Sequence, residues 1–202
     1  MATTIRFATP DDAAGVLAIY APYCESSIVS FEIAAPTETQ LRERMARITS
    51  EYPWLVCEVE GQIAGYAYAS RHRERAAYRW AVDVAVYIAE AQQRRNVGRA
   101  LYLSLFDILR EQGFVKAYAG ITLPNPASVG LHEAMGFTLV GVFRGEGFRL
   151  GQWRDVGWWE LGLLPQDADP PEPRAIGEVR GGAVVAAALA EGQRLVRTGG
   201  VA

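Results

Sequence analysis

Residues 80–112 (WAVDVAVYIAEAQQRRNVGRALYLSLFDILREQ) constrain the fold more than any other part of the chain. They begin with an almost wholly apolar run in which one carboxylate, Asp83, stands among valines and alanines. Such a run is typical of a strand that is covered on both faces. After a short basic turn, Leu101, Leu105 and Leu109 recur at helical spacing. This stretch therefore predicts a buried strand, a turn and a long amphipathic helix.

The basic turn, residues 93–99, carries three arginines and opens the predicted helix. The first turn of a helix presents free backbone N–H groups and the positive end of the helix dipole. With Arg94, Arg95 and Arg99 added, the turn predicts a site for phosphate or pyrophosphate. An ordinary turn with solvated arginines explains the same residues, because the segment has neither the P-loop pattern nor the three glycines of a dinucleotide fingerprint.

The rest of the chain alternates between strand and helix patterns. Capping signals at residues 9–12 and 37–40 begin two helices, of which the first is expected to end near Pro22. The remaining predicted elements are a first strand at 4–7, a hairpin with its turn at 60–61, a strand at 117–121, a helix at 125–136 and two last strands at 138–143 and 153–161. This succession predicts an α/β sandwich built on a mixed sheet.

Length and composition limit the class of protein. A chain of 202 residues suits one domain with a tail, and the proline-rich change after Leu164 divides it into residues 1–164 and 165–202. The second part, rich in Pro, Ala and Gly, is expected to be flexible or weakly docked, with a short helix. The net charge of −3 does not favour nucleic acid as a partner.

The cysteines and the length of the apolar runs indicate the cellular compartment in which the chain is expected. Cys24 and Cys57 stand in no metal-binding pattern, so we expect buried apolar side chains, no metal, and a reducing cytoplasmic environment. Neither a secretory signal nor a membrane span is expected, because no apolar run is long enough.

Several motifs resemble one enzyme superfamily. Gln93-x-x-Asn96-x-Gly98 is similar to the Q-x-x-G-x-G/A pyrophosphate loop of the GNAT acetyltransferases, with Asn in place of the first Gly. Asn tolerates left-handed backbone geometry better than most residues, so the loop can keep its shape. The stretches RAAYRWAVDVAVYI, LPNPASVGLHEAMGF and GFRLGQWRDVGWWEL resemble the phosphinothricin and methionine sulfoximine N-acetyltransferases. The resemblance covers residues 5–164.

The resemblance implies a fold and an activity. The fold is a twisted mixed sheet that splays apart mid-way, with acetyl-CoA lying in the cleft. The activity is transfer of the acetyl group to the amino group of a small anionic amino acid, such as phosphinothricin, methionine sulfoximine or methionine sulfone, by direct attack. Homodimers are common in the family, so one is expected here. Two other readings remain open: an acetyltransferase for another amino acid or peptide amine, and an acyl-CoA-binding module without catalysis.

Asp83 is the candidate general base. An apolar site raises the pKa of a carboxyl towards a useful value. The resembling enzymes carry Glu at this position, so the shorter Asp is expected to act through a bridging water. The alternative is a buried carboxylate that only pairs with an arginine such as Arg75 or Arg79.

His132 is the second catalytic candidate. The resembling enzymes also have His here, where many GNAT enzymes place a Tyr that protonates the leaving thiolate. An imidazole can donate or relay such a proton. A structural or surface histidine is the alternative. His72 has no support from a motif and is expected to be a solvated loop residue.

The resemblance also implies binding residues. Acetyl-CoA contacts are expected from Val86, Tyr87, Ile88, Arg94, Arg95, Asn96, Val97, Gly98, Arg99 and Asn125. Strand backbone groups can pair with pantetheine as with an added strand, and Asn125 is also a helix cap. The substrate positions are Phe31, Arg73, Arg75 and Tyr78, because arginine forks suit a carboxylate and a phosphinate. The alternative for the arginines is a solvated charged loop. Trp153, Trp158 and Trp159 are expected in the core or at a dimer surface.

Overall fold

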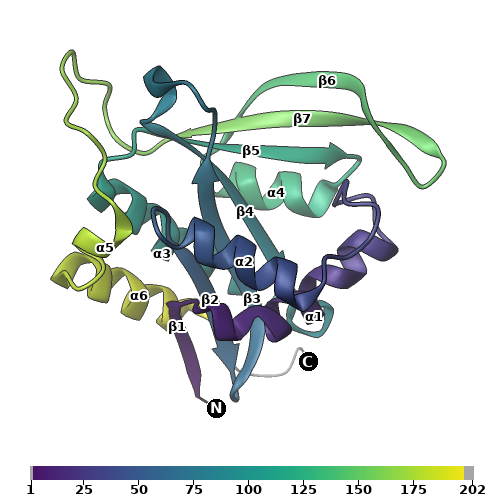
Figure 1. Ribbon diagram of the computed structural model, residues 1–202, viewed down its shortest axis with the longest axis horizontal. Coiled ribbons are helices and arrows are strands. Elements are labelled where there is room, and N and C mark those ends of the chain that lie inside the picture. Colours follow the sequence, from purple (N-terminus) through teal and green to yellow (C-terminus); the bar gives the residue numbers. More distant parts are fainter. Residues whose placement is uncertain (1, 198–202) are drawn as a thin grey trace.

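A seven-stranded mixed sheet forms the centre of the fold, in the order β1-β2-β3-β4-β5-β7-β6 (Figure 1). The computed structural model describes residues 2–197. The strands are β1 (Thr3–Phe7), β2 (Trp54–Val59), β3 (Gln62–Arg71), β4 (Ala81–Ile88), β5 (Lys116–Leu123), β6 (Thr138–Arg149) and β7 (Gln152–Gly162). The helices are α1 (Ala13–Glu25), α2 (Glu38–Ile48), α3 (Val97–Gln112), α4 (Pro126–Ala134), α5 (Ile176–Val179) and α6 (Ala183–Leu195). Short 3-10 turns are η1 (Pro10–Asp12), η2 (Ala76–Tyr78) and η3 (Glu90–Gln92).

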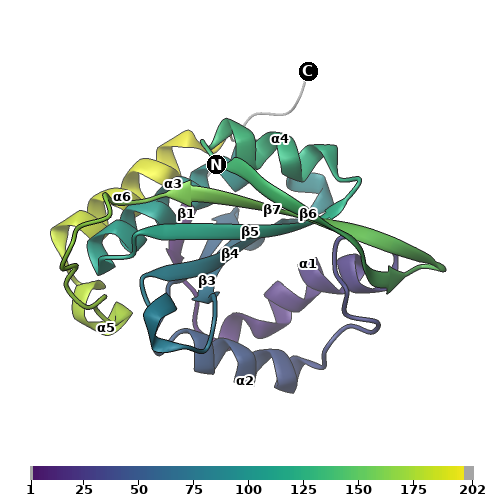
Figure 2. The same ribbon diagram turned by 90° about the horizontal axis from the view of Figure 1, so that it is seen from above.

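Helices cover both faces of the sheet, as predicted for an α/β sandwich. Figure 2 shows α1 and α2 below the sheet and α3, α4 and α6 above it. The two layers have separate cores. Val16 and Met45 of α1 and α2 pack with Tyr66 of β3 in one core, and Leu101 and Leu105 of α3 pack with Val82 in the other. Strand β4 is therefore covered on both faces.

The sheet opens between β4 and β5. These parallel strands pair only from Ala81 with Lys116 to Asp83 with Tyr118. Beyond that point β4 stays paired with β3 as far as Ile88, whereas β5 continues beside β7. The edge of β4 that faces β5 thus loses its strand partner after Asp83. Because side chains alternate along a strand, Asp83 lies on the same face as Tyr87, which packs with α1 and α2.

Local signals place most helix ends correctly. The predicted capping box begins α2, since the Gln40 N–H donates to Thr37 Oγ1 (3.2 Å) and the Thr37 N–H donates to Gln40 Oε1 (2.8 Å). The expected end of the first helix near Pro22 is wrong, because α1 continues to Glu25 with Pro22 inside it. Proline removes one backbone bond and disfavours helix. Burial of Cys24 in the last turn offsets this cost.

The tail contains a helix that packs on the body of the protein. Helix α6 lies along α3 and β1 and buries Val185, Ala188 and Gly192 (Figure 1). The Ser104 hydroxyl of α3 donates to the Ala188 carbonyl (2.8 Å). A helix of 13 residues is marginal in isolation, and the surface of α3 supplies a packing partner that the tail's own sequence does not reveal. The division into residues 1–164 and 165–202 stays a prediction.

Two further findings concern the described residues. Cys24 and Cys57 are both buried free thiols, and burial raises the pKa of Cys57 to about 12. Among residues 2–197, no helix has the length and apolar character needed to cross a membrane.

Candidate active site

A groove of about 410 Å³ lies where β4 and β5 part. It is bounded by the end of β4, by the basic turn and by the first turns of α4. The predicted acetyl-CoA residues that line it are Val86, Tyr87, Ile88, Arg94, Asn96, Val97, Gly98, Arg99 and Asn125. Arg95 is the one predicted member that does not line the groove. Its backbone faces the tail, where its carbonyl accepts from the Arg197 N–H (3.0 Å).

The basic turn has the backbone geometry that its sequence predicts. Asn96 is the N-cap of α3 and adopts the left-handed conformation, with φ 63° and ψ 9°. The first bond into the helix runs from the Ala100 N–H to the Asn96 carbonyl (2.9 Å), so the N–H groups of the preceding helical residues have no partner within α3. A Cβ at Gly98 would lie 3.2 Å from Leu131 of α4, so glycine allows this close packing. Free N–H groups beside Arg94 and Arg99 suit a pyrophosphate.

Helix α4 forms the opposite wall of the groove. The Asn125 Oδ1 accepts from the Ser128 N–H (3.1 Å), so Asn125 caps α4 while it also lines the groove. Ser128 and Leu131 line the groove too, and successive steps of three residues from Asn125 to Ser128 and from Ser128 to Leu131 could have predicted both. Tyr23 of α1 lines the groove and donates its hydroxyl to the Ile88 carbonyl (2.8 Å). No sequence signal links Tyr23 to β4, which lies far along the chain.

The Asp83 carboxylate is hydrogen-bonded to a histidine and not to an arginine. Its Oδ1 lies 2.6 Å from His72 Nδ1. The alternative in which Asp83 pairs with Arg75 or Arg79 is therefore wrong. The solvated position expected for His72 is also wrong. The His72 side chain is only 10 % exposed, because its ring stacks on Tyr118 with centroids 4.4 Å apart. Burial raises the pKa of Asp83, and the His72 bond offsets this only in part. The motif search missed His72 because the pairing depends on the contact between β3 and β4.

His132 is buried behind the groove. Its Nδ1–H donates to the Ser128 carbonyl (2.8 Å), and its Nε2 accepts from the Tyr102 hydroxyl (2.9 Å). The side chain has 4 % exposure, and this burial lowers the pKa of the imidazole. His132 does not itself line the groove. Ser128 does, and its hydroxyl oxygen lies 3.4 Å from His132 Nδ1.

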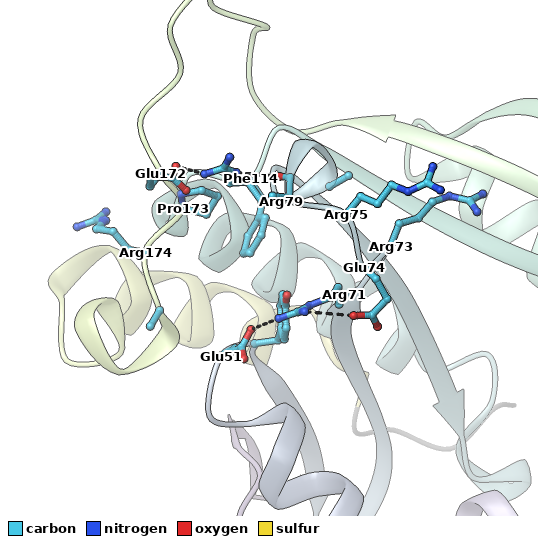
Figure 3. Close-up of a pocket in the computed structure, with 14 residues that line it drawn as sticks. Glu51, Arg71, Arg73, Glu74, Arg75, Arg79, Phe114, Glu172, Pro173 and Arg174 are labelled. Atoms are coloured by element: carbon cyan, nitrogen blue, oxygen red, sulfur yellow. Dashed lines mark hydrogen bonds and ion pairs between the residues drawn. The ribbon is translucent and has the colours of Figure 1, made fainter.

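The predicted substrate arginines line a separate pocket of about 400 Å³ (Figure 3). Three arginines of this pocket are held by carboxylates: Arg71 by Glu51 (3.2 Å) and Glu74 (3.5 Å), Arg79 by Glu172, and Arg174 by Glu111 (2.7 Å). Arg73 and Arg75 form no ion pair within residues 2–197. Figure 3 shows their guanidinium groups extending side by side, away from Glu51 and Glu172.

The two predicted aromatic residues lie in different places. Tyr78 is 43 % exposed and points its ring edge-on to His72, with centroids 6.2 Å apart. Phe31 packs under the β6–β7 hairpin, where its ring fills the space beside Gly147. Trp158 also lies edge-on to His72 at 6.2 Å, whereas Trp159 is buried in the core and Trp153 is exposed. The structure thus brings Tyr78 and Trp158 to the Asp83–His72 pair and leaves Phe31 at the hairpin.

No metal centre is found in the part of the chain that the structure describes, since no three His, Cys, Asp or Glu side chains gather to hold an ion. The groove, in contrast, fits the elongated co-substrate of the acyl-CoA transferases. It offers an unpaired strand edge, free helix N–H groups and two exposed arginines.

Comparison with known proteins agrees with this geometry. Residues 5–158 match the model of the acetyltransferase (GNAT) domain. The chain is 42% identical to the phosphinothricin N-acetyltransferase of Streptomyces viridochromogenes over 84% of its own length and 93% of that relative. It is 33% identical to the L-methionine sulfoximine/L-methionine sulfone acetyltransferase of Salmonella typhimurium, covering 79% of this chain and 94% of the other.

A solved structure shows the same fold. The phosphinothricin acetyltransferase of Sinorhizobium meliloti in complex with AcCoA superposes with a TM-score of 0.81 and 31% identity, over 89% of this chain and 98% of that one. The chain therefore belongs to the GNAT acetyltransferase family, among relatives named phosphinothricin and methionine sulfoximine N-acetyltransferases, and is an acetyl-CoA-dependent N-acetyltransferase.

Proposed function

We propose that the chain acetylates the amino group of a small anionic amino acid, such as phosphinothricin, methionine sulfoximine or methionine sulfone. The observation that carries this proposal is the pair Arg73 and Arg75, two cations without a carboxylate partner in a pocket whose other arginines are paired. A carboxylate or phosphinate can take the place of the missing partner. The names of the relatives support the same class of substrate.

The groove between β4 and α4 is the proposed site for acetyl-CoA. The co-substrate supplies an activated acetyl group as a thioester. The edge of β4 after Asp83 would bind the pantetheine amides, as an added strand does. The N–H groups of Val97 and Gly98 would bind the pyrophosphate, with Arg94 and Arg99 adding charge. Unpaired N–H groups on the same strand can stabilise negative charge on the thioester oxygen.

Asp83 and His132 are the proposed catalytic residues. The amine arrives largely protonated, so a base must remove a proton before attack. Asp83 lies at the point where the strands part, and burial raises the pKa of its carboxyl towards that task. A role for His132 in proton transfer stays a prediction. Such a transfer would have to run through Ser128, because both ring nitrogens already have partners.

The proposal also includes an oligomeric state and a cellular location. A homodimer would form through the β6–β7 hairpin, which extends beyond the body of the protein in Figure 1 and exposes Leu139, Val140, Phe143, Phe148 and Trp153. Exposed apolar side chains along one hairpin favour an interaction surface there. A cytoplasmic location stays a prediction from the two unpaired thiols and the need for acetyl-CoA.

The test is steady-state release of CoA with a panel of amines. The panel contains phosphinothricin, methionine sulfoximine, methionine sulfone and the ordinary amino acids. We expect one of the first three to have the highest kcat/KM. Faster turnover of another amine would overturn the substrate class while leaving the acetyltransferase intact. Acetyl-CoA binding without turnover of any amine would favour a non-catalytic acyl-CoA-binding module.

Arginine variants sharpen this test. Arg73→Ala and Arg75→Ala should each raise KM for the anionic amino acid by about tenfold or more, because a hydrogen bond to a charged group is worth roughly 1.5–3 kcal/mol. Arg71→Ala is the matched control, since Arg71 lines the same pocket but is already paired with Glu51. An equal effect from all three variants would contradict a specific role for Arg73 and Arg75.

A further inference from the structure

In the hydrogen-bonded pair of Asp83 and His72, one imidazole nitrogen is available for a further hydrogen bond. His72 Nδ1 bonds Asp83, but its Nε2 forms no hydrogen bond with residues 2–197. Nor is Nε2 among the side-chain atoms that are buried without a partner, so it faces accessible space. A carboxylate that accepts from Nδ1–H fixes the tautomer in which Nε2 carries a lone pair. The geometry therefore presents a basic nitrogen, held by a carboxylate, to the space beside it.

The position of this nitrogen is fixed by packing on several sides. The imidazole stacks on Tyr118 of β5, while Tyr78 and Trp158 approach its edges. Tyr118 is also the partner of Asp83 in the last rung between β4 and β5. The pair thus sits at the apex of the opening in the sheet, next to the strand edge where the thioester would lie. The other charged group that acts on Asp83 is Arg73, a proposed substrate residue.

We propose that His72 is the residue that accepts the proton of the substrate ammonium, with Asp83 behind it as the positioning carboxylate. This inference rests on the proposed function and deepens it, because it changes which atom acts as the base. Asp83 is one methylene shorter than the Glu of the resembling enzymes, and the imidazole of His72 extends its reach in place of a bridging water. Imidazole is also the side chain best suited to accept and release protons near neutral pH.

The proposed reaction converts the substrate ammonium and acetyl-CoA into an N-acetyl amino acid, the CoA thiol and a proton. His72 Nε2 takes one proton from the substrate ammonium and passes it to solvent. The substrate nitrogen then carries a lone pair. That lone pair forms the new C–N bond with the acetyl carbon, and the C–S bond breaks with its electrons going to sulfur. The second proton leaves the nitrogen and ends on the sulfur. The products are the N-acetyl amino acid, free CoA thiol and one proton in solution.

His72→Asn tests the proposal with little disturbance of the fold. An asparagine amide can still donate to Asp83, but it has no counterpart of Nε2. We expect kcat to fall by about 10²- to 10⁴-fold, the usual contribution of a positioned base. The limb of the kcat–pH profile that rises with pH should disappear, and KM for acetyl-CoA should change less than twofold. Arg42→Ala, which removes exposed ion pairs of α2 with Asp11 and Glu38 outside both pockets, is the control and should keep the wild-type profile.

A second variant separates a chemical role from a structural one. His72→Ala leaves a space against Tyr118, and added imidazole should restore part of kcat in a concentration-dependent way. If His72→Asn keeps kcat within twofold with an unchanged pH profile, while Asp83→Asn loses most of kcat, the proposal is overturned and Asp83 acts alone. Failure of the proposed function looks different, because the wild-type protein would then acetylate none of the anionic amino acids.

Discussion

The Asn96 side chain donates from Nδ2 to the backbone carbonyl of Leu195, at 3.4 Å. Asn96 stands in the basic turn that lines the acetyl-CoA groove, and Leu195 is the last residue of α6. The Arg197 N–H adds a second bond to the same turn, at the Arg95 carbonyl. The tail, which lies beyond the residues that match the family model, is therefore joined to the proposed cofactor site.

Changes at Gly192 should reveal this link. A Cβ at Gly192 would lie 2.8 Å from the Ala100 carbonyl and against the Ser104 hydroxyl, so Gly192→Ala forces α6 away from α3. Overpacking of this kind costs about 1–3 kcal/mol, and we expect Tm to fall by roughly 2–10 °C. KM for acetyl-CoA should rise as the end of α6 moves. Gly181→Ala is the control, because nothing lies within 4 Å of a Cβ there.

Substitutions of Asn96 should separate backbone shape from side-chain bonding. At φ 63°, a β-branched residue is strained by about 1–2 kcal/mol, so Asn96→Val should raise KM for acetyl-CoA by about tenfold. Asn96→Gly keeps the left-handed conformation and loses only the bond to Leu195, so KM should stay within about threefold of wild type. Equal loss in both variants, measured by steady-state kinetics, would show that the side chain matters more than the backbone.

The ionised carboxylate of Asp83 should lower the stability of the folded protein at neutral pH. Burial raises the pKa of its carboxyl, so the folded protein binds this proton more tightly than the unfolded chain does. The resulting stability is present at acid pH and is lost as the pH rises through the raised pKa. Asp83→Asn mimics the protonated form and can still accept from His72. Its Tm should equal or exceed that of wild type at pH 7, and the difference should vanish towards pH 4. A much lower Tm at pH 7 would contradict this account.

His132 should give the opposite dependence on pH. Burial lowers the pKa of its imidazole, so the unfolded chain binds this proton more tightly. Its stabilising contribution is present above about pH 6.5, the unfolded value, and is lost as the pH falls. Wild-type Tm should therefore drop between pH 7.5 and 5.5, and His132→Phe should flatten that drop. Tyr102→Phe removes the same hydrogen bond but keeps the imidazole, so its Tm should retain the pH dependence.

The elements that follow local rules were predictable, and the contacts between distant elements were not. The cap at Thr37, the left-handed Asn96 and the strand–turn–helix around them depend on residues close in sequence. The opening of the sheet after Asp83 came from the resemblance, because strand pairing leaves no local signal. His72 and Asp83 meet only because β3 and β4 lie side by side, in a register that pairs Ser70 with Asp83. The docking of α6 depends in the same way on the surface of α3.

The exposed hairpin gives the last prediction, which concerns assembly. Trp153 is 68 % exposed and packs edge-on against Phe148, with centroids 5.5 Å apart, at the far end of β6 and β7. A tryptophan at the centre of an interface commonly contributes about 2 kcal/mol or more, which corresponds to roughly a thirtyfold change in Kd. Trp153→Glu should therefore shift a dimer to monomer in sedimentation velocity at low micromolar concentration, whereas Trp153→Phe should leave it dimeric. Both variants should keep the wild-type far-ultraviolet circular-dichroism spectrum, which reports the backbone fold. If wild type is itself monomeric at these concentrations, the hairpin is not a dimer surface.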